Sequence, residues 1–458
     1  MNSLCNRRRV ARALALPAIV TLLAAGVAGA ATDASAPLSR PTAKVKPFVI
    51  ERNDIPALTF PPSTSYCLTN LGYRCYQPAQ LAKAYNLTPL HSTGIDGSGQ
   101  TIVIVDSFGS PTIQQDLKTF DQTFGLPDPP SLTVIQPAGP VPPFDPTNSD
   151  MLGWATETTL DVEWAHVFAP GAAIVLVETP VSETEGVQGF PEIVAAENYV
   201  IDHDLGDVIS QSFGATEETF PSPLSIFGLR SAFENAADHH VTVLGASGDT
   251  GATDYELNLS DLYPMRVNSW PSSDPLVTSV GGTLLTLDDA GNRLAPDVVW
   301  NDSGAGGGGV SAVFERPEFQ DKVRKVVGSF RGTPDISMSA ACGGTVILYY
   351  SFNPVRIGYH LVCGTSEASP EFAGVVAMAD QLAGRRLGHL GGRLYELGKH
   401  ALVDVTQGNN TFGPFTNSDG NTYTVQGYSA GPGYDLASGL GTIDANKFVR
   451  ALAGKHDD

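Results

Sequence analysis

The stretch Thr101-Ile-Val-Ile-Val-Asp106 is an unbroken apolar run that ends in an acidic residue. Short runs rich in β-branched residues predict buried strands. Further runs of this kind follow at residues 173–177, 207–210 and 241–244. Helical patterns alternate with them, at residues 112–124, 157–168, 192–203 and 224–240. This alternation predicts an α/β fold whose parallel sheet is flanked by helices on both faces.

The composition fits a large globular protein. Of 458 residues, 42% are hydrophobic and 16% are charged, so the chain can bury a sizeable core. We expect residues 66–454 to form one domain. Acidic side chains outnumber basic ones by 48 to 27, a formal net charge of −21. Nucleic acid and anionic membranes are therefore not expected partners.

The first thirty residues have the order of a secretory signal. Arg7-Arg8-Arg9 precedes an apolar run from Ala13 to Ala25, and small residues follow at 28–30. A signal anchor is the alternative, but this run is short for a bilayer span of roughly 20 residues. We therefore expect residues 1–30 to be a signal peptide and the protein to be secreted to the extracellular space. Residues 31–65, rich in Ala, Pro, Ser and Thr, indicate a linker or short pro-segment.

The cysteine count agrees with export. Without Cys5 in the expected signal, the even set Cys67, Cys75, Cys342 and Cys363 remains. Three pairings are possible, and we favour the two local pairs, Cys67–Cys75 and Cys342–Cys363.

The most specific motif is Cys363-Gly-Thr-Ser366-Glu-Ala-Ser-Pro370, which lies between an apolar segment and a helical stretch from Pro370 to about Leu382. A serine at a strand-to-helix turn exposes its hydroxyl beside backbone N–H groups that can bind an oxyanion. Ser366 is thus a candidate nucleophile. The alternative is a helix N-cap with a first-turn proline at 370.

Two further segments of the sequence carry candidate catalytic carboxylates. In the expected helix, Glu157 and Asp161 are one turn apart, with roughly 6 Å between their Cβ atoms. Two negative charges at this distance raise the pKa of one carboxyl, and the pair can share a proton. Such a pair can act as a general base in acid, although a solvated acidic face is the commoner explanation. Asp249 follows the strand expected at residues 241–244, where parallel sheets place their active crevice. If protonated, it can donate to an oxyanion; otherwise it is a turn aspartate.

Along the chain the candidates come in the order Glu157 and Asp161, then Asp249, then Ser366. With these residues in this order, the chain from Tyr66 to Val449 resembles the catalytic domain of the sedolisin (serine-carboxyl peptidase, S53) family. The matching stretches lie at residues 76–81, 97–106, 157–170, 247–249, 306–314, 364–366 and 431–441. The resemblance implies a subtilisin-like fold with a seven-stranded parallel sheet. It also implies an endopeptidase in which Ser366 is the nucleophile, Glu157 the base, Asp161 its support and Asp249 the oxyanion donor.

The resemblance implies two further sites. One structural Ca²⁺ is expected at Asp404, Val405, Gly431, Gly433 and Asp435, whose carboxylates and carbonyls, with a water, form an all-oxygen shell. The segment Ser210-Gln-Ser212-Phe-Gly214 is expected to be an edge strand that pairs with the substrate backbone. We expect polypeptide substrates, no membrane partner, and a monomer.

Alternatives and one departure remain. A subtilisin-like triad could use Asp106 with Ser366, but no matching histidine segment is present. A carboxylate glycosidase could use Glu157 and Asp161, which would leave Ser366 idle. A silent binding protein on the same fold is the third alternative. The family's large N-terminal pro-domain has no counterpart in residues 31–65, so the route of maturation is open.

Overall fold

The apolar run at residues 101–106 forms β5 (Thr101–Ser107), which lies inside the main sheet of the computed structural model. The structure describes residues 42–398 and 400–454, so the expected signal at 1–30 lies outside the described residues. On one side β5 pairs in parallel with β7 (Ala173–Thr179), from Thr101 opposite Ala173 to Ser107 opposite Thr179. On the other side it pairs with β10 (Val208–Gln211). Residues Pro41–Asp458 form one compact unit.

Within the described residues the main sheet has seven parallel strands and one short antiparallel strand, β15 (Val298–Val299), beside β14. The parallel strands follow the order β6 (Leu132–Ile135), β7, β5, β10, β12 (Thr242–Ala246), β14 (Thr278–Leu284) and β18 (Ile336–Ser339). The expected seven-stranded parallel sheet is therefore confirmed.

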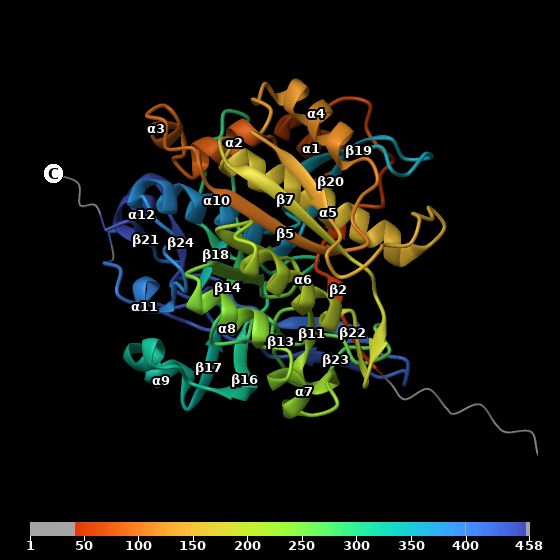
Figure 1. Cartoon of the computed structure of the whole chain (residues 1–458), viewed down its shortest axis with the longest axis vertical. Helices are drawn as coiled ribbons and strands as arrows, with labels where there is room; N and C mark the ends of the chain where they lie inside the picture. Colours follow the sequence, from red (N-terminus) through yellow and green to blue (C-terminus); the bar gives the residue numbers. More distant parts are fainter. Residues whose placement is uncertain (1–41, 399, 455–458) are drawn as a thin grey trace, which may run out of the picture. The chain divides into compact units, whose positions relative to one another are not determined.

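Helices cover both faces of this sheet (Figure 1). On one face Ile102 and Ile104 of β5 pack in a core with α5 (Ser149–Phe168) and α10 (Thr365–Ala383). On the other face the alternating residues Val103 and Val105 pack with α6 (Phe190–Asp202) and α8 (Ser231–Asp238). Because side chains alternate along a strand, one apolar run supplies both cores.

Three expected helices differ in extent, and α5 begins at Ser149, eight residues before the start expected at 157. The pattern at 224–240 forms two helices, α7 (Pro223–Phe227) and α8, with Gly228 following the first. The helix expected from Pro370 begins five residues earlier, at Thr365, and contains Pro370 in its interior. At this position a proline removes the N–H that would bond to the Ser366 carbonyl, and this carbonyl accepts from the Ser212 hydroxyl at 3.4 Å instead.

The described part of residues 31–65 pairs with the domain. β1 (Ala43–Lys44) pairs with β9 (Val187–Gln188), and β2 (Lys46–Pro47) with β11 (Phe213–Thr216). β3 (Ile50–Glu51) then pairs with β20 (Gly358–Cys363). The remaining larger elements are α1 (Thr64–Asn70), β4 (Arg74–Tyr76), α2 (Pro78–Ala84), α4 (Ile113–Phe124), β16 (Gly309–Glu315), β17 (Phe330–Thr333), β19 (Gly344–Tyr350), β22 (Phe412–Thr416), β23 (Thr422–Val425) and α12 (Ala445–Leu452).

Two covalent links and a buried ion pair hold the loops around the sheet. The disulfides are Cys67–Cys75 and Cys342–Cys363, so both expected local pairs are confirmed. The second joins the end of β20 to the loop before β19.

No helix in the described parts of the chain combines the length and apolar character needed to cross a bilayer.

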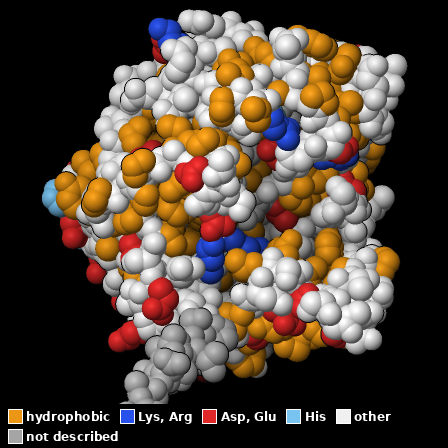
Figure 2. All heavy atoms as spheres, turned by 90° about the vertical axis from the view of Figure 1, so that its right-hand side faces the viewer, with side chains coloured by type: hydrophobic (Ala, Val, Ile, Leu, Met, Phe, Trp, Pro, Cys, Tyr) orange, Lys and Arg blue, Asp and Glu red, His pale blue; other side chains and the backbone are white. Residues whose placement is uncertain are grey.

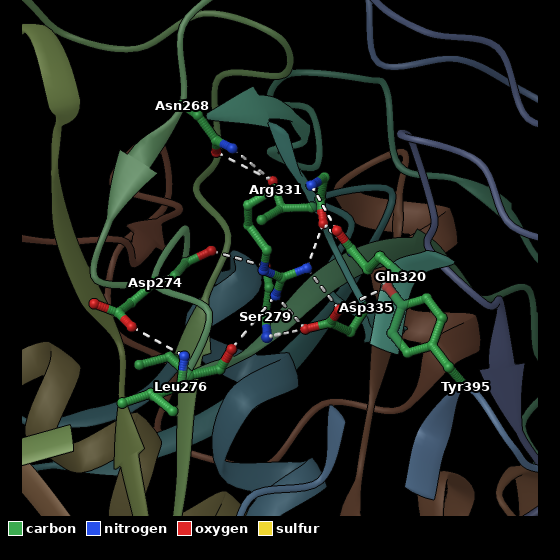
Figure 3. A network of polar contacts seen from close by, with 12 residues as sticks. Asn268, Asp274, Leu276, Ser279, Gln320, Arg331, Asp335 and Tyr395 are labelled. Carbon is green, nitrogen blue, oxygen red and sulfur yellow. Dashed lines mark hydrogen bonds and ion pairs between the residues drawn. The ribbon is translucent and has the colours of Figure 1, made fainter. Parts of the chain in front are cut away.

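The ion pair joins Arg331 of β17 to Asp335, just before β18 (Figure 3). Two guanidinium nitrogens donate to the two carboxylate oxygens at 2.8 and 2.5 Å. Asp335 also accepts from the Ser279 amide and the Tyr395 hydroxyl, both at 2.8 Å. These buried bonds hold Asp335, just before β18, against Ser279 of β14. They therefore tie together two neighbouring strands of the main sheet.

Candidate active site

Ser366 lies in the first turn of α10, directly after β20. The intervening Gly364 has φ +134°, a conformation that favours glycine, and it turns the chain sharply from strand to helix. Of the amides in this first turn, that of Thr365 donates to Asp249 at 2.8 Å and that of Glu367 to the Gly364 carbonyl at 3.0 Å. The Ser366 hydroxyl donates to the Ser212 carbonyl at 3.3 Å.

Glu157 and Asp161 lie on α5, which is buried on all sides over this stretch. Glu157 Oε2 accepts a hydrogen bond from the Val49 amide at 3.0 Å, and Asp161 Oδ1 accepts from the Ser212 hydroxyl at 2.8 Å. Both side chains have 0% exposure, which excludes the solvated acidic face that such spacing most often indicates.

Burial raises the pKa of Glu157 well above its ordinary value, and the charge of Asp106 adds to the rise. The neighbouring Ser366 hydroxyl acts against this rise, so the nucleophile lies close to the base; its proton is directed to the Ser212 carbonyl, and Glu157 Oε1 has no hydrogen-bond partner among the described residues. Burial likewise raises the pKa of Asp161, with contributions from the charges of Asp106 and Glu157. The helix therefore holds two buried carboxyls whose pKa values are both raised.

Asp249 follows β12 and points at the start of α10. Its Oδ1 accepts from the Thr365 amide at 2.8 Å and from the Thr365 hydroxyl at 2.9 Å. Its Oδ2 is buried without a protein partner. Burial raises the pKa of Asp249 to about 7, while the bonds from Thr365 oppose the rise. In acid this carboxyl is protonated and can donate a hydrogen bond.

Asp106, at the end of β5, belongs to the same acidic group, and sequence reasoning placed it only in a subtilisin-like triad. Burial raises its pKa to about 7, and the neighbouring Thr158 hydroxyl acts against this rise. Its charge contributes to the raised pKa values of Glu157 and Asp161. The available signal was its position at the carboxyl end of a parallel strand.

The expected substrate strand needs one correction. Ser210 is inside β10, between Leu244 of β12 and Ile104 of β5, so both of its backbone edges are already paired. The prediction that it pairs with substrate was wrong for this reason. Ser212 and Gly214 lie past the end of β10, and Gly214 in β11 pairs with β2.

The residues expected to bind calcium come together at one turn. The Gly431 amide donates to Asp435 Oδ2 and the Gly433 amide donates to Asp404 Oδ2, each at 2.9 Å. Within the described residues no three His, Cys, Asp or Glu side chains gather as a metal site, so backbone carbonyls such as that of Val405 would have to complete the shell. Two carboxylates with neighbouring carbonyls fit a hard cation.

The face on the right of Figure 1 is hollowed near its middle, and basic and acidic side chains meet in the hollow (Figure 2). A pocket of about 390 Å³ lies beside the start of α5. It is lined by Val49, Glu51, Asn53, Ser149, Leu152, Gly153, Thr156, Tyr350, Phe352, Asn353 and Arg356.

Comparison with known proteins agrees with this geometry. The chain is 32% identical to kumamolisin of Bacillus sp. (strain MN-32) over 389 residues, which cover 82% of the chain and 63% of kumamolisin. It is also 32% identical to sedolisin of Pseudomonas sp. (strain 101), over 57% of the chain and 43% of sedolisin. The chain thus spans less than two thirds of the length of these relatives. No protein-family model matches it.

A solved structure shares the fold. The Pseudomonas sedolisin (serine-carboxyl proteinase), complexed with two molecules of pseudo-iodotyrostatin, superposes with a TM-score of 0.67 at 26% identity. The match covers 83% of this chain and 99% of that one. Together with the sequence relatives and the seven-stranded sheet, this similarity shows that the chain belongs to the sedolisin family.

Proposed function

We propose that this chain is a secreted serine-carboxyl endopeptidase that hydrolyses polypeptides in acid, with Ser366 as nucleophile and Glu157 as general base. The observation that carries the proposal is the meeting of three groups at one buried site: the Ser366 hydroxyl, the Glu157 carboxyl and the Asp249 carboxyl. Membership of the sedolisin family supports peptidase chemistry and polypeptide substrates.

In the proposed reaction the Ser366 hydroxyl attacks the carbonyl carbon of the scissile bond, and Glu157 accepts the hydroxyl proton. Glu157 then gives this proton to the nitrogen of the leaving amine, and an acyl-enzyme remains. A water molecule then attacks the acyl-enzyme in the same way, with Glu157 as base, and releases the carboxylic acid product from Ser366. The raised pKa makes the ionised Glu157 a stronger base than an ordinary glutamate, and only the fraction of Glu157 that is ionised in acid accepts the proton.

Asp249 is the proposed donor to the oxyanion. A protonated carboxyl next to the first turn of α10 can stabilise the negative charge that develops on the carbonyl oxygen. Because the pKa of Asp249 is about 7, the donor is present in acid and is lost as the pH rises through this value. This is the physical reason to expect acid activity.

Secretion, monomeric state and calcium are parts of the same proposal. Two disulfides fit an oxidising compartment and support export. One Ca²⁺ would be held by Asp404 and Asp435 with carbonyls of Val405, Gly431 and Gly433. When bound, it would neutralise both carboxylates and tie the turn at 431–435 to the segment at 404–405.

The test is hydrolysis of an unfolded protein between about pH 2 and 8 by the wild type, Ser366→Ala and Glu157→Gln. We expect activity confined to acid and a loss of at least about a thousandfold in each variant. Glu163→Gln is the matched control, because Glu163 is equally buried on α5 but its Oε2 accepts from the Tyr349 amide. Activity that peaks at neutral pH, or survives Ser366→Ala, would disprove the mechanism.

A further inference from the structure

Residues 46–49 of the chain itself run through the candidate active site. The Phe48 amide donates to the Ser212 carbonyl at 3.1 Å, and this same carbonyl accepts from the Ser366 hydroxyl. The next amide, that of Val49, donates to Glu157 at 3.0 Å. The peptide bond between Phe48 and Val49 therefore has its nitrogen beside the proposed acid–base group.

The carbonyl of this bond lies on the side of the proposed oxyanion donor. A Cβ on Gly364 would overlap both the Phe48 carbonyl oxygen and Asp249 Oδ2, so these two oxygens border one small space. Glycine keeps the space open, next to the first turn of α10. The nitrogen of the Phe48–Val49 bond thus lies beside Glu157, and its carbonyl oxygen lies beside Asp249. A scissile peptide bond would be placed in the same way.

The preceding residues pair with the expected substrate strand. β2 runs antiparallel to β11, with Pro47 opposite Phe213 and Lys46 opposite Gly214. The Phe48 ring lies against Gly214, where a Cβ would come within 2.7 Å of the ring, so this glycine leaves room for an aromatic side chain. This is peptide binding by strand addition, with a ring in an adjoining pocket.

Lys46 has a specific acidic partner. Its ammonium lies 3.0 Å from Asp254 Oδ1 and sits over the rings of Tyr255 and Phe48, at 4.2 and 4.6 Å from their centroids. The Asp254 side chain is only 4% exposed, and it accepts from the Tyr255 amide at 2.8 Å and from the Ser269 hydroxyl. These bonds position the carboxylate independently of the lysine.

We propose that the cleft selects polypeptides with a basic residue two positions before an aromatic residue whose carbonyl is attacked, and that Asp254 reads the basic side chain. The chain's own segment Lys46-Pro47-Phe48-Val49 is such a sequence, and its Phe48–Val49 bond is cut. The inference rests on the proposed peptidase activity and names the substrate class of that site. A partly buried ion pair and an aromatic face both favour a cation at this position.

The chemistry balances as an ordinary hydrolysis. The Ser366 oxygen bonds to the Phe48 carbonyl carbon, the bond to the Val49 nitrogen breaks, and that nitrogen takes the serine proton through Glu157. Water then adds its hydroxyl to the Phe48 carbonyl carbon and returns a proton to Ser366. The products are a chain that ends in the Phe48 carboxylate and a chain that begins with the Val49 amine.

The first test is mass spectrometry of the full chain, wild type and Ser366→Ala, after incubation in acid. We expect a chain beginning at Val49 from the wild type alone. A wild type that digests an unfolded protein yet never begins at Val49 would overturn the assignment of this bond while leaving the peptidase proposal intact. Failure of both reactions would instead remove the peptidase proposal, and this inference with it.

The second test measures kcat/KM for a synthetic peptide with the sequence of residues 43–52 and for its analogue with methionine in place of Lys46. In the wild type we expect kcat/KM for the lysine peptide to be about ten times that for the methionine peptide. In Asp254→Asn this ratio should fall close to one. Asp238→Asn, an exposed acid at the end of α8, is the control and should keep the wild-type ratio. Each ratio is internal to one protein, so a loss of folded material does not affect it.

A wild type without preference for lysine, or a preference that Asp254→Asn leaves unchanged, would overturn the role of Asp254. If Asp254→Asn does not fold, the wild type decides alone with a third peptide that carries glutamate in place of Lys46. This peptide should be cut more slowly than the methionine analogue, because the carboxylate then faces Asp254. Equal rates for the three peptides would contradict the proposal.

Discussion

Asp249 Oδ1 accepts both the amide and the hydroxyl hydrogen bond of Thr365, so one residue holds the proposed oxyanion donor against the start of the nucleophile helix. The other oxygen, Oδ2, faces the space beside Gly364. Both bonds from Thr365 favour the ionised carboxyl and oppose the rise that burial causes in its pKa. Thr365 is therefore a positioning residue that also tunes the acid range.

The first prediction concerns Thr365→Val. Losing one of the two bonds should lower kcat about tenfold, because Asp249 is then held less firmly. Losing a bond to the ionised form also raises the pKa of Asp249 above about 7, so its proton persists to higher pH. The alkaline limb of the pH profile should consequently move upward, and kcat against pH measures both effects.

Thr365→Ser is the matched control, since it keeps the hydroxyl and should retain the wild-type profile. A purely structural role for Thr365 would lower kcat at every pH without moving the limb. A downward shift of the alkaline limb in Thr365→Val would show that the sign of this argument is wrong.

Much of the framework follows from the sequence because local rules apply to it. The run at 101–106 has one simple solution, a buried strand, and its alternate residues fill two cores. The local cysteine pairs are close in sequence and were correctly favoured. Ser210 was misplaced because sheet order, which fills both of its edges, is a long-range property.

The occupied cleft could not be predicted. Residues 46–49 form no motif of their own, and their contacts are with Ser212 and Glu157, far along the chain. Likewise, the spacing of Glu157 and Asp161 does not reveal that α5 is buried all round. Burial of a helix depends on what packs against it, and only the assembled fold supplies that.

The second prediction concerns stability against pH. Burial raises the pKa of Glu197 to about 8, whereas the unfolded chain titrates near 4.3. The folded state thus holds an extra proton between these values, and the free energy of unfolding falls as the pH rises through this window. Asp106 and Asp249, with pKa values of about 7, act in the same direction. We expect the Tm to be at least about 5 °C higher at pH 4 than at pH 8.

Glu197→Gln should reduce this dependence, because the variant keeps the shape of the side chain without the buried ionisation. Its Tm at pH 8 should exceed that of the wild type, and the difference should vanish near pH 4. The control is Asp238→Asn on the exposed end of α8, which should leave the pH dependence unchanged. A Tm that rises steadily from pH 4 to pH 8 would contradict the prediction.

The third prediction concerns calcium. If Asp404 and Asp435 hold Ca²⁺, adding the ion at about a hundred times its Kd should stabilise the fold by about 2.7 kcal/mol. Chelation should reverse the effect, and Asp404→Asn should weaken binding, as measured by calorimetry and by Tm. Asp419→Asn is the control for a general charge effect. A Tm that does not respond to Ca²⁺ in the wild type would remove the site.

The last prediction concerns the buried ion pair of Arg331 and Asp335. Arg331→Met leaves the Asp335 carboxylate buried without its cation, which should cost about 3–5 kcal/mol of the free energy of unfolding at pH 7. The cost should be smaller near pH 4, because an unpaired buried carboxyl takes up a proton. Adding Asp335→Asn should recover part of the loss, since the amide has no charge to bury. Denaturant unfolding at the two pH values measures each effect, and an equal loss at both would show that packing, rather than the unpaired charge, sets the cost.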